Sequence, residues 1–116
     1  MSTPRRNRIP AIAQWCVING KNSYYRSKLE LGYARHLETL KARGAIKDFE
    51  HEPRCFWFLS IKRGIRSYLP DFRVDNLDDT HHYVEVKGYM DSKSATKIKR
   101  FRKYYPEEKL IVFMKP

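Results

Sequence analysis

The sequence lacks the features that would place it in a membrane, outside the cell or among zinc proteins. No apolar run approaches the roughly 18 residues that a membrane-spanning helix needs, and the opening stretch MSTPRRNRIP lacks the apolar core of a secretory signal. There are only two cysteines, Cys16 and Cys55, and neither has a Cys or His partner at zinc-site spacing. These absences predict a cytosolic chain with free thiols and no structural zinc.

The chain also has no glycine-rich phosphate loop, no internal repeat and no low-complexity tract. Its 116 residues, of which 41% are hydrophobic and 14% aromatic, are enough to build one domain around a core. We therefore expect a basic N-terminal arm over residues 1–16 and a single domain over residues 17–116.

Acidic residues are scarce relative to basic ones. The chain has 13 Asp and Glu against 24 Lys and Arg, which gives a net charge of +11. This excess predicts a polyanionic partner, and nucleic acid is the leading candidate because bound Lys and Arg release counterions from phosphates. An anionic membrane surface fits less well. Arg5 and Arg6 in the predicted arm could contact phosphates.

The hydrophobic periodicity predicts an α/β domain with a mixed sheet. Helical spacing, a Ser27 start and a Gly44 cap define the clearest helix, and the apolar run KLIVFM predicts a strand that is covered on both faces. The predicted elements are a hairpin around Asn19-Gly20, a helix over 27–44, one bent or two short strands over 45–61, strands over 65–74 and 82–87, a helix from Asp91 or Ser92 to Tyr105, and a strand over 109–114. The core order is thus helix, three strands, helix, strand.

Charged residues interrupt the most strand-like segment, YLPDFRVDNLDDTHHYVEVKG. Alternation puts Glu85 and Lys87 on one strand face and the intervening valine on the other, and a hairpin-like return can bring Asp71 beside Glu85. Two clustered carboxylates repel unless a cation lies between them, and Mg²⁺ prefers such oxygen ligands. The pattern predicts a Mg²⁺ site beside a lysine; the alternative is an exposed strand face with cross-strand ion pairs.

Pro70-Asp71 followed by Glu85-Val86-Lys87 resembles the PD-(D/E)xK nuclease signature. The blocks YRSKLE, YLPDF and YVEVKG resemble those of phage endonuclease I, a family of Holliday junction resolvases, and of related small phage-borne nucleases. This resemblance spans about residues 17–114. It implies a restriction-endonuclease-like core and Mg²⁺-dependent hydrolysis of DNA, with Mn²⁺ as a substitute for Mg²⁺.

The resemblance also implies roles for individual residues. Asp71 and Glu85 would bind the metal ion, the backbone carbonyl of Val86 would be a further ligand, and Lys87 would serve the attacking water. A further acid from the first helix is common in the family, and here that acid would be Glu30.

The residues alone leave Glu30 open between two roles. Ser27-x-x-Glu30 is a capping box, in which the glutamate satisfies a backbone donor at the helix start. Glu30 also lies about 65° from the centre of the apolar stripe of this helix, so it could border the core and reach a site. That stripe consists of Leu29, Tyr33, Leu37 and Leu40.

The second predicted helix has a run of cations with no acid among them: Lys97, Lys99, Arg100, Arg102 and Lys103. Like charges at near-helical spacing cost stability unless an anion is near, so phosphate contact is favoured over a merely solvated face. Arg26 and Lys93 are weaker candidates for phosphate contact. The aromatic residues 56–58 are expected in the core rather than as a base-stacking platform.

Taken with the resemblance, these residues predict a Mg²⁺-dependent endonuclease that acts on DNA. It would be selective for branched or junction DNA and act in phage recombination, in the cytoplasm of a phage-infected or prophage-carrying bacterial cell. A homodimer would suit two symmetric cuts. The alternatives are a non-catalytic basic nucleic-acid-binding protein and a nicking or flap-cutting nuclease of the same fold.

Overall fold

The computed structural model describes residues 13–115, so the predicted phosphate contacts Arg5 and Arg6 lie outside the described residues. The elements in chain order are β1 (Gln14–Ile18), β2 (Lys21–Tyr25), α1 (Lys28–Ala42), β3 (Asp48–His51), β4 (Phe56–Trp57), β5 (Ser67–Tyr68), β6 (Phe72–Asp75), β7 (His81–Lys87), α2 (Ser92–Tyr104) and β8 (Leu110–Met114). Residues 14–16 of the predicted arm belong to β1. Neither helix is long and apolar enough to cross a membrane.

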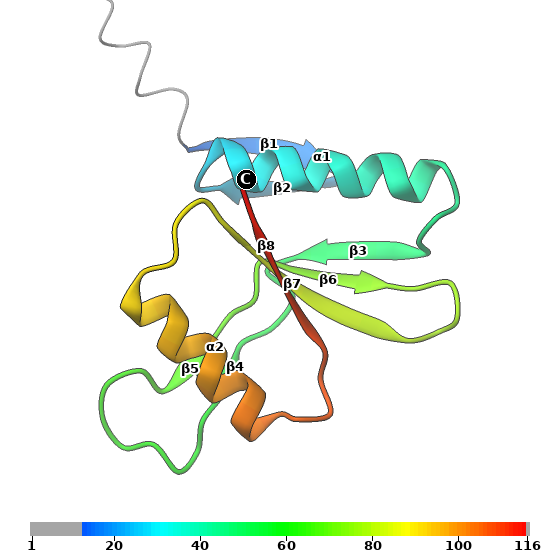
Figure 1. Cartoon of the computed structure of the whole chain (residues 1–116). Helices are drawn as coiled ribbons and strands as arrows, with labels where there is room; N and C mark the ends of the chain where they lie inside the picture. Colours follow the sequence, from blue (N-terminus) through cyan, green and yellow to red (C-terminus); the bar gives the residue numbers. More distant parts are fainter. Residues whose placement is uncertain (1–12, 116) are drawn as a thin grey trace, which may run out of the picture.

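The domain is built on a four-stranded mixed sheet with the order β3-β6-β7-β8. Its β3-β6 and β6-β7 pairs are antiparallel, whereas β7 and β8 run parallel and are connected through α2. The β1–β2 hairpin and α1 lie on one side of this sheet, and α2 and the β4–β5 pair lie on the other (Figure 1). The predicted α/β class with a mixed sheet is confirmed.

Local signals correctly predicted the hairpin and the first helix. Asn19 and Gly20 both have positive φ angles, 56° and 76°, as a two-residue hairpin turn requires. The Ser27 hydroxyl accepts a hydrogen bond from the Glu30 amide, and Gly44, with φ of 77°, follows the helix end. The buried side of α1 is formed by Glu30, Ala34 and Leu37, so the predicted stripe was centred incorrectly and Glu30 lies inside the buried face.

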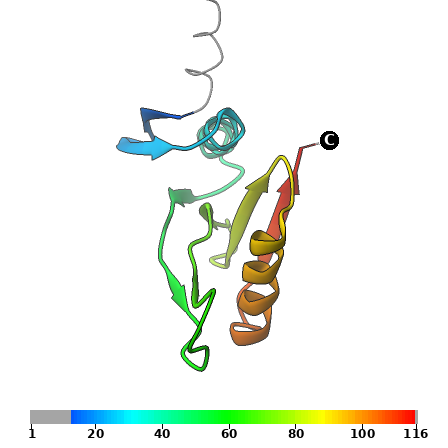
Figure 2. The same ribbon diagram turned by 90° about the vertical axis from the view of Figure 1, so that its left-hand side faces the viewer.

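Two hydrophobic cores cover the two faces of the sheet. The core beneath α1 includes Ala34, Leu37, Phe49, Phe72, Val74, Val84 and Val86. The core beneath α2 includes Phe56, Phe58, Tyr68, Tyr83, Ile98, Phe101 and Leu110. Figure 2 shows α2 lying alongside β7 and β8, with α1 and the β1–β2 hairpin at the other end of the molecule. Alternate residues of β7 therefore pack into different cores, which holds that strand on both faces.

The strand predicted over residues 65–74 is in fact two strands in different sheets. β5 pairs with β4, whereas β6 joins the central sheet. The chain breaks at the buried Pro70, which has no backbone N–H to donate to a ladder. Five strands rather than three therefore lie between α1 and α2, because β4 and β5 form a sheet of their own.

One prediction about burial was wrong, and another held for only two of its three residues. β8 is the last strand of the sheet order, and its residues Ile111, Phe113 and Met114 are exposed rather than covered on both faces. In β4, Phe56 is buried but its neighbour Trp57 is half exposed, because adjacent strand residues point to opposite faces.

Candidate active site

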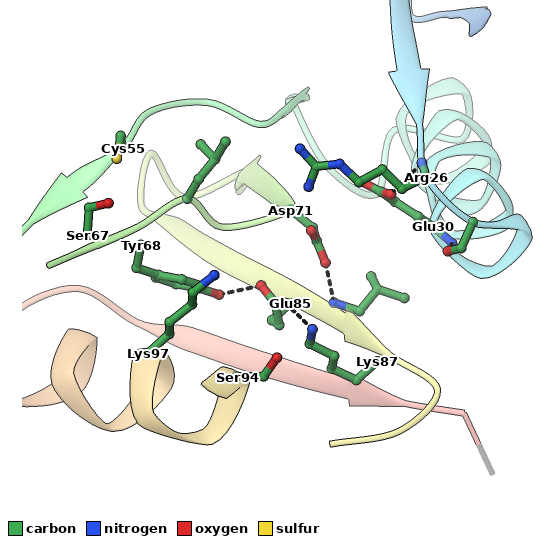
Figure 3. A pocket seen from close by; sticks show the side chains of 13 residues that line it. Arg26, Glu30, Cys55, Ser67, Tyr68, Asp71, Glu85, Lys87, Ser94 and Lys97 are labelled. Atoms are coloured by element: carbon green, nitrogen blue, oxygen red, sulfur yellow. Dashed lines mark hydrogen bonds and ion pairs between the residues drawn. The ribbon is translucent and has the colours of Figure 1, made fainter. Parts of the chain in front are cut away.

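A cleft of about 410 Å³ lies where the start of α1, the β5–β6 segment, the end of β7 and the start of α2 meet (Figure 3). The predicted residues that line it are Arg26, Glu30, Asp71, Glu85, Val86, Lys87 and Lys97. Tyr68, Cys55, Ser67 and Ser94 are among its other lining residues. The structure thus brings all four predicted catalytic side chains to one cavity, from α1, β7 and the β5–β6 segment.

The pairing of β6 with β7 places Asp71 beside Glu85. Phe72 is opposite Val84, so one step along the register Asp71 stands opposite Glu85. Phe72 and Val84 both pack into the α1 core, and alternation turns the two carboxylates to the other face. The Val86 N–H donates to Asp71 Oδ2 at 2.8 Å, which fixes the aspartate against the strand (Figure 3).

Glu85 is 7% exposed and has two charged or polar partners. The Tyr68 hydroxyl donates to its Oε1 at 2.5 Å, and Lys87 Nζ lies 3.3 Å from its Oε2. Burial, followed by the charge of Glu85, raises the pKa of Tyr68 far above its ordinary value, so its hydroxyl stays protonated and donates. The sequence did not lead us to predict Tyr68 as a site residue. The available signal was its position three residues before Asp71, in the same short segment as Pro70.

Asp71 carries charge that its neighbours do not fully compensate. Burial, the charge of Glu85 and, to a smaller extent, the charge of Glu30 together raise the pKa of Asp71 to about 7. The Val86 N–H and the Lys87 ammonium act in the opposite direction but do not cancel the rise. A buried carboxylate cluster of this kind favours either protons or a bound cation.

Glu30 combines the two roles that the sequence left open. Its Oε1 accepts a hydrogen bond from the Arg26 N–H at 3.0 Å, so it helps to cap α1. Its Oε2 lies 2.6 Å from Nε2 of the buried His51. The same carboxylate forms part of the cleft wall and raises the pKa of Asp71.

His51 is a second residue that the sequence analysis missed. An ionised Glu30 carboxylate can only accept a hydrogen bond, so Nε2 of His51 is the donor in this pair. Nδ1 lies 2.7 Å from the Ser23 hydroxyl, and the ring stacks on Tyr25 at 4.2 Å. Ligand atoms of Glu30, His51 and Glu52 lie within 4.8 Å of one another, but both ring nitrogens of His51 are already hydrogen-bonded. The sequence did contain a signal for the burial of His51: it lies two residues after Phe49 in β3, so the two side chains point to the same buried face.

The donor set of the cleft fits a hard divalent cation. Asp71, Glu85 and Glu30 offer carboxylate oxygens, the ligand type that Mg²⁺ and Mn²⁺ prefer. Asp71 Oδ1 makes no hydrogen bond within residues 13–115. Burial and the charges of Glu85 and Glu30, which raise the pKa of Asp71, favour a cation beside it. Within residues 13–115, the only three acid or histidine ligand atoms that lie within 4.8 Å of one another are those of Glu30, His51 and Glu52, so Asp71, Glu85 and Glu30 would have to close around such an ion. The Val86 N–H donates to Asp71, and its carbonyl stays a predicted ligand.

The predicted phosphate-binding residues fall into three groups. Arg26 and Lys97 line the cleft itself, and Arg26 also lies 3.6 Å from Glu52. Lys93, Lys99 and Lys103 are exposed on α2 beyond the cleft. Arg100 donates a hydrogen bond to the Ile65 carbonyl, so its guanidinium anchors the loop between β4 and β5; its contact with phosphate stays a prediction.

Fold and cleft together define an α/β domain with an acidic, lysine-containing candidate active site. The chain belongs to the family described as "Protein of unknown function (DUF1064)", which matches residues 13–116. None of the curated proteins compared with the chain matches it.

Proposed function

We propose that this protein is a Mg²⁺-dependent endonuclease that hydrolyses DNA phosphodiester bonds. The observation that carries the proposal is the convergence of Asp71, Glu85, Glu30 and Lys87 on one cleft with cations at its rim. The order Pro70-Asp71 and Glu85-Val86-Lys87, which resembles the PD-(D/E)xK signature, supports the same reaction.

Each residue has a defined part in this chemistry. A divalent ion bound by the carboxylates would supply Lewis acidity, which lowers the pKa of water and stabilises the leaving oxygen. Tyr68 holds the Glu85 carboxylate in a fixed orientation. Lys87, 3.3 Å from Glu85, is placed to orient a water or to stabilise negative charge on the phosphoryl oxygens. Arg26 and Lys97 would bind the flanking phosphates.

The proposed substrate is branched or junction DNA, and the proposed setting is recombination in the cytoplasm of a phage-infected or prophage-carrying cell. The net charge of +11 supports a nucleic-acid partner, and the resemblance to junction-resolving enzymes supports the branched substrate. A homodimer would allow two symmetric cuts.

The decisive experiment mixes the purified chain with supercoiled, linear and four-way-junction DNA, and with single-stranded RNA, in Mg²⁺, Mn²⁺ or EDTA. Cleavage that requires the metal is the expected result, with the junction cut faster than linear duplex. No cleavage of any substrate in either metal would contradict the proposal.

A second candidate function is a non-catalytic nucleic-acid-binding protein. The observation in its favour is that Glu85 already has two partners, Lys87 and Tyr68, so part of the carboxylate cluster is balanced without a metal. This candidate predicts tight DNA binding in EDTA with no cleavage in any metal.

Replacing Lys97 by alanine should weaken DNA binding about three- to tenfold without changing substrate preference. Lys97 lines the cleft and is exposed, and losing one phosphate contact should lower the slope of log K against log salt by about 1. Binding measured by anisotropy in EDTA over a range of salt concentrations tests this. The matched control is Lys109→Ala, which removes another exposed lysine just before β8; equal losses in both variants would show that the effect is only net charge.

Replacing Tyr68 by phenylalanine should raise the Mg²⁺ concentration for half-maximal cleavage about tenfold, because partners of metal ligands typically contribute 10–100-fold to affinity or activity. The change removes the hydroxyl that donates to Glu85 and keeps the buried ring. Cleavage rates over a Mg²⁺ titration give the measurement. Tyr83→Phe is the control, since it removes a hydroxyl from the same core; an equal shift there would refute a specific role for Tyr68.

A further inference from the structure

The segment 54–69, which we name the β4–β5 arm, leaves the rim of the cleft as a hairpin (Figure 1). Cys55, Ser67 and Leu69 at its base line the cleft. Trp57 is paired with Ser67, and residues directly opposite each other in a strand pair share a face. Leu59 lies exposed in the turn that follows β4. The face that lines the cleft therefore continues outward along the arm.

This outer face is apolar and unusually exposed. Trp57 is 54% exposed, Leu59 is 87% exposed and Leu69 is 38% exposed. Their neighbours Phe56 and Phe58 are buried in the α2 core, so the arm already supplies its share of the core from its inner face. Burial in the domain does not explain why the outer positions are large and apolar.

The arm is held in place along its length. The Tyr105 hydroxyl donates to the Trp57 carbonyl, the Ser60 hydroxyl donates to Tyr104, and Arg100 donates to Ile65. The Phe58 N–H donates to the Arg66 carbonyl and extends the hairpin beyond β4 and β5. The apolar face is thus presented by a fixed ribbon and is continuous with the cleft.

Charge identifies the kind of partner that fits this face. The arm contains no acidic residue and has four exposed cations, Arg54, Lys62, Arg63 and Arg66. A polyanion is complementary to this charge, and an exposed aromatic ring on a basic segment is typical of surfaces that bind unpaired bases, which offer a π face beside a phosphate. In a regular duplex the bases are already stacked on one another.

We propose that the outer face of the β4–β5 arm binds unpaired nucleotides, with Trp57 stacked on a base and Leu59 packed beside it. The substrate class is then nucleic acid in which unpaired nucleotides adjoin a duplex. This inference rests on the proposed function only in assuming that the duplex phosphates occupy the adjacent cleft.

The test measures binding in EDTA, so that cleavage plays no part. Trp57 becomes the only tryptophan in a Trp15→Phe chain, since the sequence has two. A duplex with a three-nucleotide bulge should quench Trp57 fluorescence, and the fully paired duplex of the same sequence should not. The preference for the bulged duplex should fall about tenfold in Trp57→Ala and be largely retained in Trp57→Phe, which keeps an aromatic ring.

The control variant is Leu77→Ser, which removes a leucine that is 59% exposed in the loop between β6 and β7, at the other end of these strands from Asp71 and Glu85. It should leave the preference unchanged. An unchanged preference in Trp57→Ala would overturn the inference, as would quenching by phosphatidylserine vesicles equal to that by the bulged duplex. If the preference for the bulged duplex depends on Trp57 but no metal supports cleavage, the proposed function fails and this inference stands. If cleavage requires a metal but the preference does not depend on Trp57, this inference fails and the proposed function stands.

Discussion

Replacing Asp71 by asparagine, or Glu85 by glutamine, is expected to reduce Mg²⁺-dependent DNA cleavage by at least about 10³-fold. Each change keeps the size of the side chain and removes one negative charge from the carboxylate cluster of the cleft. The loss follows because a neutral amide oxygen binds a hard dication far less well than a carboxylate does. Initial rates on supercoiled DNA over a Mg²⁺ titration measure the effect.

DNA binding separates loss of chemistry from loss of structure. In EDTA both variants should bind DNA at least as tightly as the original chain, because a negative charge has been removed from a cleft that faces phosphates. The matched control is Asp75→Asn, which makes the same change on β6, at an ion pair with Arg73. Cleavage that persists in Asp71→Asn, or is lost equally in Asp75→Asn, would contradict the assigned site.

The central part of the site was predictable because it depends on local geometry. A strand has a period of two residues, so Glu85 and Lys87 share a face in any fold that makes 81–87 a strand. Asp71 lies near them because β6 and β7 are consecutive antiparallel strands, the commonest arrangement for neighbours in sequence. Both inferences need only the alternation of residues and a short connection.

The supports of the site were not predictable, because they depend on the packing of distant segments. Tyr68 and Glu85 are 17 positions apart, and Glu30 and His51 are 21 positions apart. Neither contact is implied by spacing; each requires the placement of α1 and the β5–β6 segment against the sheet. The helical pattern put Glu30 at the border of the core, but it lies inside, where His51 and a backbone N–H satisfy its carboxylate.

Sheet order was the other property that the pattern did not contain. An apolar run such as KLIVFM is typical of a central strand, yet β8 has a neighbour on one side only. The aromatic run at 56–58 was likewise expected in the core. In a strand it must present one of its three rings to the opposite face, and that ring is Trp57.

Without metal, Asp71→Asn should make the protein more stable at pH 8 and have a much smaller effect at pH 5. The pKa of Asp71 is raised to about 7 in the folded chain, against about 3.9 when unfolded. The folded state therefore binds more protons than the unfolded state between these two values. Stability from this group is fully present below about pH 4 and is lost as the pH rises through about 7.

The size of the effect follows from the same shift. Between pH 5 and pH 8 the free energy of unfolding should fall by about 2 to 3 kcal/mol through Asp71 alone, and the asparagine variant should not show this fall. Urea unfolding in EDTA at the two pH values measures it, with Asp75→Asn, at the end of β6, as the control. A constant difference between Asp71→Asn and the original chain at both pH values would contradict the prediction.

Mg²⁺ should offset much of this difference in stability. A cation that binds only the folded state stabilises it by RT ln(1 + [L]/Kd), about 2.7 kcal/mol at 100 times Kd. At pH 8 the original chain should gain this amount when saturated with Mg²⁺, whereas Asp71→Asn should gain little. The carboxylate cluster would then both lower the stability of the metal-free fold and bind the metal. The same negative charge that raises the pKa of Asp71 also attracts the ion.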